Sequence, residues 1–132
     1  MTVLGVQLFS IPVSDQDRAR DFYLRVLGLE LVEDRQMGPG RRWVQVRPVG
    51  GGTAITLVTW FESMPPGSST GIVLETDDVE GELERLRALG VAVADGVQQA
   101  PWGRYLQVQD PDGNGLILQQ SALGVGRSAD AG

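Results

Sequence analysis

The side chains that most often carry out catalysis are missing from this sequence. It contains no His, Cys or Lys, and all eleven basic residues are arginines. An imidazole base, a thiolate nucleophile, a Schiff-base amine and the soft metal ligands are therefore excluded. Any proton transfer would have to use an Asp, a Glu, Tyr23, Tyr105 or a water molecule.

Length and composition predict one globular domain. The chain has 132 residues, a mass of 14.2 kDa and 42% hydrophobic residues, which is enough for a sizeable core. No apolar run approaches the roughly 20 residues of a membrane span. The first ten residues, "MTVLGVQLFS", lack the basic stretch and the cleavage site of a signal peptide. We therefore expect a cytoplasmic protein that contacts no membrane.

The net charge gives information about partners. A value of −6 argues against nucleic acid as a partner and modestly favours a cationic ligand. Because cysteine is absent, disulfides have no role in the fold.

An internal repeat governs the organisation of the chain. Residues 13–34, "VSDQDRARDFYLRVLGLELVED", resemble residues 76–96, "TDDVEGELERLRALGVAVADG". Residues 41–46, "RRWVQV", resemble 103–108, "GRYLQV", in the same order and at nearly the same offset. Two such matches indicate a duplication.

Each half has the pattern β-α-β-β-β. In the first half a helix follows an N-cap at Ser14 and ends before Gly28, which suits the position after a C-cap. Predicted strands are 3–12, 29–35, 42–48 and 53–60 in the first half, and 71–76, 91–95, 104–109 and 115–120 in the second. The second helix is predicted at 79–89. We expect a single domain over 1–122, made of modules at about 1–60 and 70–120, and a flexible tail at 123–132.

Strand alternation predicts which side chains share a face. In 42–47 the apolar Val44 and Val46 alternate with Trp43 and Gln45, and 104–109 repeats the pattern. The apolar side chains should pack under the helices, and the aromatic and amide side chains should face the other side. The predicted fold class is α+β, with two tandem βαβββ modules whose curved mixed sheets form a cup with the helices outside.

The sequence resembles the vicinal-oxygen-chelate superfamily, which includes glyoxalase I, bleomycin-resistance proteins and extradiol dioxygenases. The likeness is carried by "IPVSDQDRARDFYLRVLGLEL" (11–31), "TDDVEGELERLRALGV" (76–91) and "DPDGNGLILQ" (110–119), together with the duplicated order of elements. The resemblance is specific for the fold. It is weak for the reaction, because such proteins include several enzyme classes and non-catalytic binders.

The resemblance also implies where a metal would bind. Metalloenzymes of this kind use His and Glu on the opening and closing strands of each half, which correspond here to Leu8, Thr56, Gly71 and Ile117. None of these side chains holds a divalent ion well, and their sequence neighbours include no carboxylate. We therefore predict no metal and no cofactor.

The candidate ligand-binding residues are those predicted to face the cup. They are Leu8, Ser10, Trp43, Gln45, Thr56, Val58, Trp60, Gly71, Val73, Tyr105, Gln107, Ile117 and Gln119, with Trp102 as a lid residue. For the four aromatic residues the alternative roles are dimer-interface packing at Trp43 and Tyr105, capping of the core at Trp60, and a loop anchor at Trp102.

Charged candidates are fewer. Glu75 is the best-placed carboxylate for a catalytic base, and its alternative role is a charge at the rim. Arg42 and Arg104 recur in both halves and could grip an anion, but their strand parity points away from the cup. Asp77, Asp78, Asp110 and Asp112 are interpreted as cap and turn residues.

Two classes of function remain open. The first is a metal-free binder, similar to bleomycin-resistance proteins, that sequesters a flat small molecule in an aromatic-lined cup. The second is a metal-independent enzyme of the same fold, of lyase or isomerase type, that uses Glu75 or a tyrosine as acid or base. An effector-sensing module is a third, weaker possibility. The resemblance further implies a homodimer with two equivalent sites.

Overall fold

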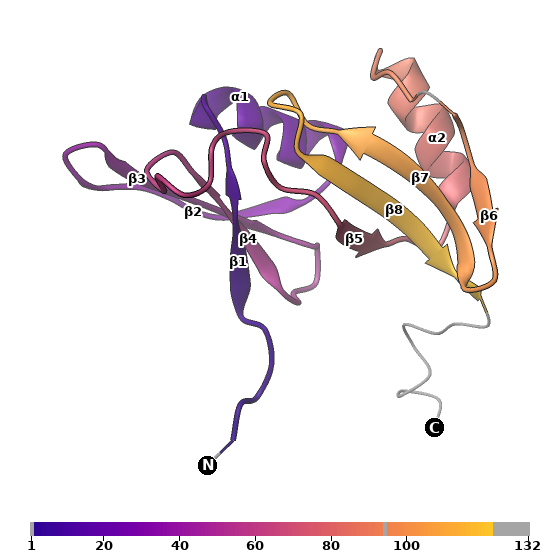
Figure 1. Ribbon diagram of the computed structural model, residues 1–132, viewed down its shortest axis with the longest axis horizontal. Helices are drawn as coiled ribbons and strands as arrows, with labels where there is room; N and C mark the ends of the chain where they lie inside the picture. Colours follow the sequence, from indigo (N-terminus) through magenta and orange to yellow (C-terminus); the bar gives the residue numbers. More distant parts are fainter. Residues whose placement is uncertain (1, 94, 123–132) are drawn as a thin grey trace. The chain divides into compact units, whose positions relative to one another are not determined.

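Each half of the chain forms one four-stranded sheet and one α-helix (Figure 1). The structure is a computed structural model, and it describes residues 2–93 and 95–122. The elements are β1 (Leu8–Pro12), α1 (Gln16–Asp21), η1 (Phe22–Val26), β2 (Glu30–Gly38), β3 (Arg41–Arg47), β4 (Ala54–Val58), β5 (Ile72–Glu75), α2 (Val79–Ala88), β6 (Gln98–Ala100), β7 (Gly103–Gln109) and β8 (Gly115–Ser121). The predicted tail at 123–132 lies outside the described residues.

The two sheets have the same strand order. The first is β1-β4-β3-β2 and the second is β5-β8-β7-β6. In each sheet the opening and closing strands are parallel, and the other neighbours are antiparallel. The predicted fold class, α+β with two βαβββ modules and mixed sheets, is confirmed.

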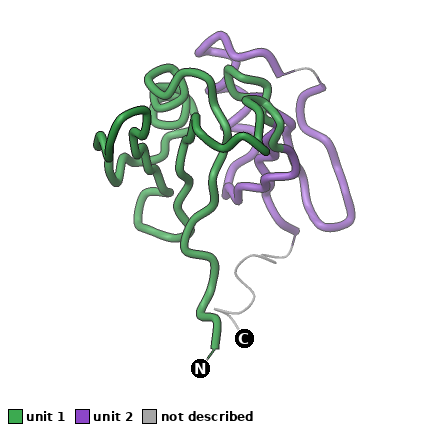
Figure 2. The backbone as a smooth tube through the Cα atoms, turned by 60° about the vertical axis from the view of Figure 1, so that its left-hand side comes forward, with its two compact units in different colours: residues 1–69, 110–114 green, residues 70–109, 115–132 purple. Residues whose placement is uncertain are grey.

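The chain divides into two compact units, coloured separately in Figure 2. Unit 1 is Met1–Ser69 with Asp110–Asn114, and unit 2 is Thr70–Gln109 with Gly115–Gly132. The turn between β7 and β8 therefore belongs to the unit formed by the first half. The extent of a single domain over 1–122 stays a prediction.

The core of unit 1 lies between α1 and one face of its sheet. Helix α1 contacts β3 and β4. Val44 and Val46 of β3 are fully buried, while Trp43 and Gln45, which alternate with them, are only partly buried. This confirms the alternation predicted for the strand. The other large buried side chains of the unit are Ile11, Val13, Phe22, Tyr23, Ile55, Leu57 and Val58.

The start of α1 differs from the prediction by one residue. The N-cap is Asp15, whose backbone is extended and whose carboxylate accepts a hydrogen bond from the backbone N–H of Arg18. Ser14 is not the cap, because its backbone N–H and its hydroxyl both donate to the carboxylate of Asp112. The second half of the predicted helix also differs, because α1 ends at Asp21 and continues as the π-helix η1. The helical segment as a whole ends before Gly28, as predicted, and Gly28 has a left-handed φ of 75°.

The first strand is shorter than predicted. Residues 3–7 are not in a strand, because the partner strand β4 begins only at Ala54, opposite Leu8. Before Leu8 the two segments are joined only by individual hydrogen bonds. The hydroxyl of Thr53 donates to the carbonyl of Val6, and the N–H of Ala54 donates to the carbonyl of Gln7. The predicted end of the fourth strand at residue 60 is also wrong, since β4 ends at Val58.

The turn of residues 110–114 is held inside unit 1 by a buried polar network. The carboxylate of Asp110 accepts hydrogen bonds from the hydroxyl of Tyr23 at 2.8 Å and from the side-chain amide of Asn114 at 2.8 Å. That amide also donates to the carbonyl of Pro12, and its oxygen accepts from the backbone of Ser69. These bonds satisfy groups that would be costly to bury alone.

Unit 2 repeats the arrangement with α2 against β7 and β8. The N-cap is Asp78, which accepts from the backbone N–H of Gly81 at 3.1 Å. Val79 and Leu86 of the helix are fully buried. The sheet residues buried in this unit are Leu106, Val108, Leu116 and Leu118, which agrees with the predicted alternation in 104–109.

The strand predicted at 91–95 is wrong. Residues 91–93 and 95 form no strand, and the edge strand β6 lies later, at Gln98–Ala100. The cause is the end of α2: Gly90 is left-handed with a φ of 80°, and the backbone N–H of Val91 bonds back to the carbonyl of Leu86. In the part of the chain that is described, no helix is long and apolar enough to cross a membrane.

Candidate ligand-binding site

In unit 1, the sheet face opposite α1 carries a row of polar side chains. Cross-strand pairing aligns Ser10 of β1 with Thr56 of β4, and Thr56 with Gln45 of β3. The hydroxyls of Ser10 and Thr56 are hydrogen-bonded at 2.8 Å. The indole N–H of Trp43 donates to the side-chain oxygen of Gln45 at 2.9 Å. We call Ser10, Thr56, Gln45 and Trp43 the polar row.

A paired charge continues this face on β2. Glu33 is the cross-strand partner of Gln45, and Arg35 is the partner of Trp43. Their side chains form an ion pair of 3.0 Å. On the same face of β3, Arg47 is paired with Glu30 at 2.7 Å, and Arg41 is exposed with no ion pair among the described residues.

The opposite face of this sheet carries the arginine predicted to point away from the cup. Arg42 is ion-paired with Asp34 at 2.8 Å and with Asp17 at 2.8 Å. Hydrogen bonds from Arg42, joined by those from Arg20, outweigh desolvation and lower the pKa of Asp34 from its usual 3.8 to about 2. The second predicted arginine, Arg104, is likewise ion-paired, with Glu80 at the start of α2.

The corresponding face of unit 2 carries amides and one carboxylate. Pairing places Val73, Ile117 and Gln107 in one row, and Glu75, Gln119 and Tyr105 in the next. These six residues were predicted to share a face, and the register places them together.

Glu75 itself has a structural partner. Its two carboxylate oxygens accept hydrogen bonds from the backbone N–H and the hydroxyl of Ser121, at 3.1 and 2.6 Å. The carboxylate is exposed and holds the end of β8 beside β5. This geometry corresponds to the rim charge that the sequence left as the alternative to a catalytic base.

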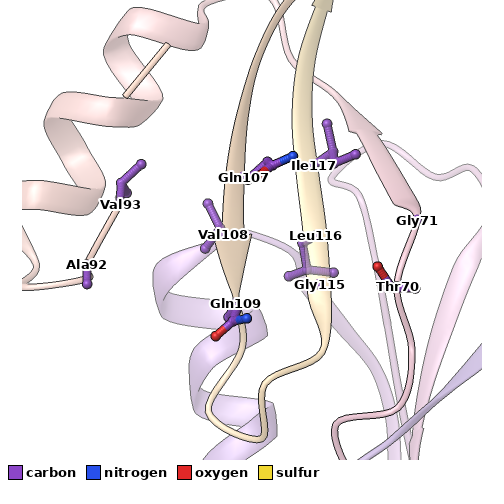
Figure 3. A pocket seen from close by; sticks show the side chains of 10 residues that line it. All are labelled: Thr70, Gly71, Ala92, Val93, Gln107, Val108, Gln109, Gly115, Leu116 and Ile117. Atoms are coloured by element: carbon purple, nitrogen blue, oxygen red, sulfur yellow. The ribbon is translucent and has the colours of Figure 1, made fainter. Parts of the chain in front are cut away.

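A pocket with a volume of about 690 Å³ lies within unit 2 (Figure 3). It is lined by Thr70, Gly71, Ala92, Val93, Gln107, Val108, Gln109, Gly115, Leu116 and Ile117. None of these side chains is ionisable, and the polar ones are two amides and one hydroxyl. Pockets of 300–1,000 Å³ with mostly apolar walls and a few polar groups are typical of small-molecule sites.

Three of the predicted residues, Gly71, Gln107 and Ile117, line this pocket. The alternation along the strand also predicts Gln109, because it lies two residues after Gln107 on the same face. Alternation did not predict Ala92 and Val93 as lining residues, because the sequence pattern assigned them to a strand at 91–95 that the structure does not have.

The aromatic candidates are dispersed. Trp43 is partly buried in unit 1, and Tyr105 is partly buried in unit 2. Trp60 follows β4 and packs edge-on against Phe61, with ring centroids 6.1 Å apart. Trp102 does not lie in a long loop: it occupies the tight turn between β6 and β7 and is 57% exposed.

The remaining candidates contribute little open surface. Thr56 and Val58 are buried, and Leu8 is partly buried. The positions that correspond to metal ligands do not fit an ion, since Leu8 and Ile117 are hydrocarbon, Gly71 has no side chain and the hydroxyl of Thr56 is bonded to Ser10. Among residues 2–93 and 95–122, no three acidic side chains gather as a metal site would require.

Each unit has a sheet face that its own helix does not cover, and unit 2 has an uncharged pocket. Together with the duplicated βαβββ topology, these features suit a protein that binds a small molecule. The family model described as Glyoxalase/Bleomycin resistance protein/Dioxygenase superfamily matches residues 5–118. The chain belongs to this superfamily.

Similar proteins include both solved structures and an uncharacterised relative. TnmS3, described as an antibiotic binding protein from Streptomyces sp. CB03234, is 50% identical with a TM-score of 0.87, over 92% of this chain and 99% of that one. A glyoxalase/bleomycin resistance protein from the same strain is 49% identical with a TM-score of 0.80, over 88% of this chain and 100% of that one. YetH of Bacillus subtilis (strain 168) is 32% identical over 114 residues, covering 84% of this chain and 93% of YetH.

Proposed function

We propose that this protein binds a flat aromatic small molecule without a metal ion and sequesters it, and that the ligand is an antibiotic. The observation that carries the proposal is the sheet face of unit 1 opposite α1, where the partly exposed indole of Trp43 is hydrogen-bonded to the side chain of Gln45. The uncharged pocket of about 690 Å³ in unit 2 is a second surface suited to a small molecule. The 50% identity to TnmS3, an antibiotic binding protein, supports the choice of ligand. Sequestration requires only binding, which suits a chain without His, Cys or Lys.

The aromatic residues support a flat ligand. Trp43 and Tyr105 lie at equivalent positions of the two repeats, each partly exposed beside an amide side chain. A planar guest gains about 0.5–1.5 kcal/mol from each aromatic contact beyond the area that it buries.

We further propose that the protein acts as a homodimer in the cytoplasm. Val3, Leu4 and Val6, before β1, are 66–96% exposed, and a second copy would remove this apolar surface from water. Light scattering tests the assembly, because a dimer has twice the chain mass of 14.2 kDa. A mass of one chain at micromolar concentration would refute it.

The binding proposal is tested by tryptophan fluorescence during titration with planar cationic and neutral compounds. We expect saturable quenching by at least one compound. Trp43→Ala should weaken binding of that compound about tenfold, since a lost stacking contact is worth roughly 1.4 kcal/mol. Val49→Ala, an exposed apolar truncation outside the strands, is the control and should leave affinity unchanged.

Circular dichroism must show that both variants are folded. If no compound in the panel perturbs the tryptophan signal, the binding proposal is wrong. If a compound is converted rather than bound, the protein is an enzyme, and Glu75→Gln is the next variant to measure.

A further inference from the structure

The amide of Gln45 has its orientation fixed by a neighbour. An indole N–H can only donate, so the atom of Gln45 that faces Trp43 must be the oxygen, as the 2.9 Å bond from Trp43 Nε1 to Gln45 Oε1 has it. The Nε2 group is then directed away from the indole. Because no buried side-chain nitrogen or oxygen in the described residues lacks a partner, this unbonded Nε2 group is accessible. Gln45 therefore presents a donor on the open face of the first sheet.

Ser10 offers a second donor in the same row. Thr56 is fully buried and Ser10 is only partly buried, and their hydroxyls are 2.8 Å apart. The arrangement of lower cost is the one in which Thr56 donates its buried hydrogen to Ser10, because an unused donor is expensive away from water. The hydroxyl hydrogen of Ser10 then faces outward. Two strand spacings separate Ser10 from Gln45, which is roughly 10 Å.

Most of the charges that share a face with these donors are paired. Glu33 and Arg35 are paired with each other at 3.0 Å, and Arg47 of β3 is paired with Glu30 at 2.7 Å. Arg41, two residues before Trp43 on the same face, is exposed and forms no ion pair among the described residues, so the unpaired charge here is positive. The unit 2 pocket has no ionisable lining residue. A cationic guest would lose its hydration without gaining a counter-charge at either place.

We propose that the guest is an aromatic molecule that is not a cation and that carries a carbonyl-type acceptor. Its ring stacks on the indole of Trp43, and its acceptor takes a hydrogen bond from Nε2 of Gln45. Gln45 thus has two roles: its oxygen positions the indole, and its nitrogen selects the guest. This inference rests on the proposed binding function and specifies its ligand class.

Two substitutions separate the two roles of Gln45. Gln45→Glu keeps an oxygen that accepts from the indole of Trp43 but removes the donor. Gln45→Met has a similar length and removes both. If the role of Gln45 were purely structural, the two variants would differ in stability only. Neither substitution would then change the relative affinity of the protein for different guests.

The probes are 9-fluorenone and fluorene, flat molecules of the same skeleton that differ in one carbonyl. Affinities are measured by titration of the full chain in a low concentration of dimethyl sulfoxide. The ratio of the two dissociation constants is compared between wild type and variants, because this double difference removes the unequal hydrophobicity of the probes. The preference for fluorenone should fall about 2- to 10-fold in both variants, the range expected for one net hydrogen bond.

Fluorene separates the positioning role. Its affinity should be unchanged in Gln45→Glu and should fall in Gln45→Met, where the indole loses its partner. In ¹H–¹⁵N spectra, fluorenone should shift both the Trp43 indole and the Gln45 side-chain resonances, whereas fluorene should shift mainly the indole. The spectra of Trp43→Phe and Gln45→Glu assign these resonances.

Failure of this inference is distinguishable from failure of the binding function. If Gln45→Glu leaves the fluorenone preference intact, Gln45 does not select a carbonyl, although binding stands. The same conclusion follows if neither probe binds while another compound of the panel gives saturable quenching. If no planar compound binds at all, both proposals are wrong.

Discussion

Removal of one hydroxyl tests the network that holds the 110–114 turn in unit 1. Tyr23 is fully buried, Asp110 is 5% exposed, and the phenol donates to Asp110 Oδ2 at 2.8 Å. Tyr23→Phe keeps the ring and its edge-on contact with Phe22 at 5.4 Å, so it opens no cavity of methyl size. Asp110 Oδ2 retains one donor, the side-chain amide of Asn114. A buried hydrogen bond to a charged group is worth about 1.5–3 kcal/mol, which is the expected loss in unfolding free energy.

Urea unfolding, followed by tryptophan fluorescence and far-UV circular dichroism, measures this loss. The midpoint should fall while the dependence on denaturant stays constant. The matched control is Tyr105→Phe, because Tyr105 is partly exposed and its hydroxyl has no hydrogen-bond partner among the described residues. That variant should change stability by no more than about 0.5 kcal/mol. Equal losses in the two variants would refute the importance of the buried bond.

The same network gives a signed dependence on pH. Burial, with the nearby carboxylate of Asp110, raises the pKa of Tyr23 well above its usual value of 10.0. The folded state keeps the phenol protonated while the unfolded chain releases the proton, so this stability is complete below pH 10 and is lost as pH rises further. The loss is about 1.4 kcal/mol per pH unit for one proton. The advantage of wild type over Tyr23→Phe should therefore vanish within about two pH units above 10; an advantage that persists would contradict this account.

The other predictions concern an ion pair, a glycine and metals. The lowered pKa of Asp34 gives stability that is present above about pH 4 and is lost as pH falls towards about 2. Asp34→Asn should remove this acid-dependent part and cost about 1 kcal/mol at neutral pH, measured by urea unfolding. Gly67→Ala should cost about 2 kcal/mol or more, because its φ is 84° and a Cβ would lie 2.3 Å from the carbonyl oxygen of Asp112; Gly50→Ala, with open space and φ of 95°, should cost only about 1 kcal/mol. Elemental analysis of dialysed protein should find no stoichiometric Ni, Zn, Fe or Mn, and chelators should leave the thermal midpoint unchanged; one tightly bound equivalent would contradict the ligand chemistry argued above.

The fold was predictable because its signals are periodic and occur twice. Alternation in 42–47 and 104–109 assigned Val44 and Val46 to the core and left Trp43 and Gln45 on the open face, as the structure has them. The repeat then required one topology for both halves, and the two sheets have it. Periodicity is sufficient here because burial depends on the face that a side chain shares and not on its individual partner.

Two of the errors occurred where a competing hydrogen bond decided a local choice. Ser14 and Asp15 are both good N-caps by type, and Ser14 is withdrawn from that role by Asp112, 98 positions further along the chain. The segment after Gly90 has the composition of a strand, but Val91 is bonded to the preceding helix. Local patterns carry no information on such competition.

For the site, the sequence predicts which residues share a face but not how their polar atoms are paired. Parity places Trp43 and Gln45 side by side, but only the structure shows that one bond between them fixes the direction of the remaining amide donor. The pocket in unit 2 is a similar case, since Ala92 and Val93 reach it through an irregular segment.

Two positions of unit 1, Leu8 and Thr56, correspond to metal ligands in metalloenzymes of this superfamily. Their chemistry explains why the pairing of polar atoms on this face matters. Leu8 contributes hydrocarbon, and the hydroxyl of Thr56 is paired with Ser10, so neither position supplies a charge with which to hold an anionic oxygen or an ion. Binding energy must then come from apolar area, aromatic contact and a few neutral hydrogen bonds, each worth only about 1 kcal/mol. A site of this kind discriminates between guests by shape and by the match of donors to acceptors. The fixed orientation of Gln45 beside Trp43 is the feature of unit 1 that supplies both, because a rigid indole defines the plane of the guest and a directed donor defines where its acceptor must lie.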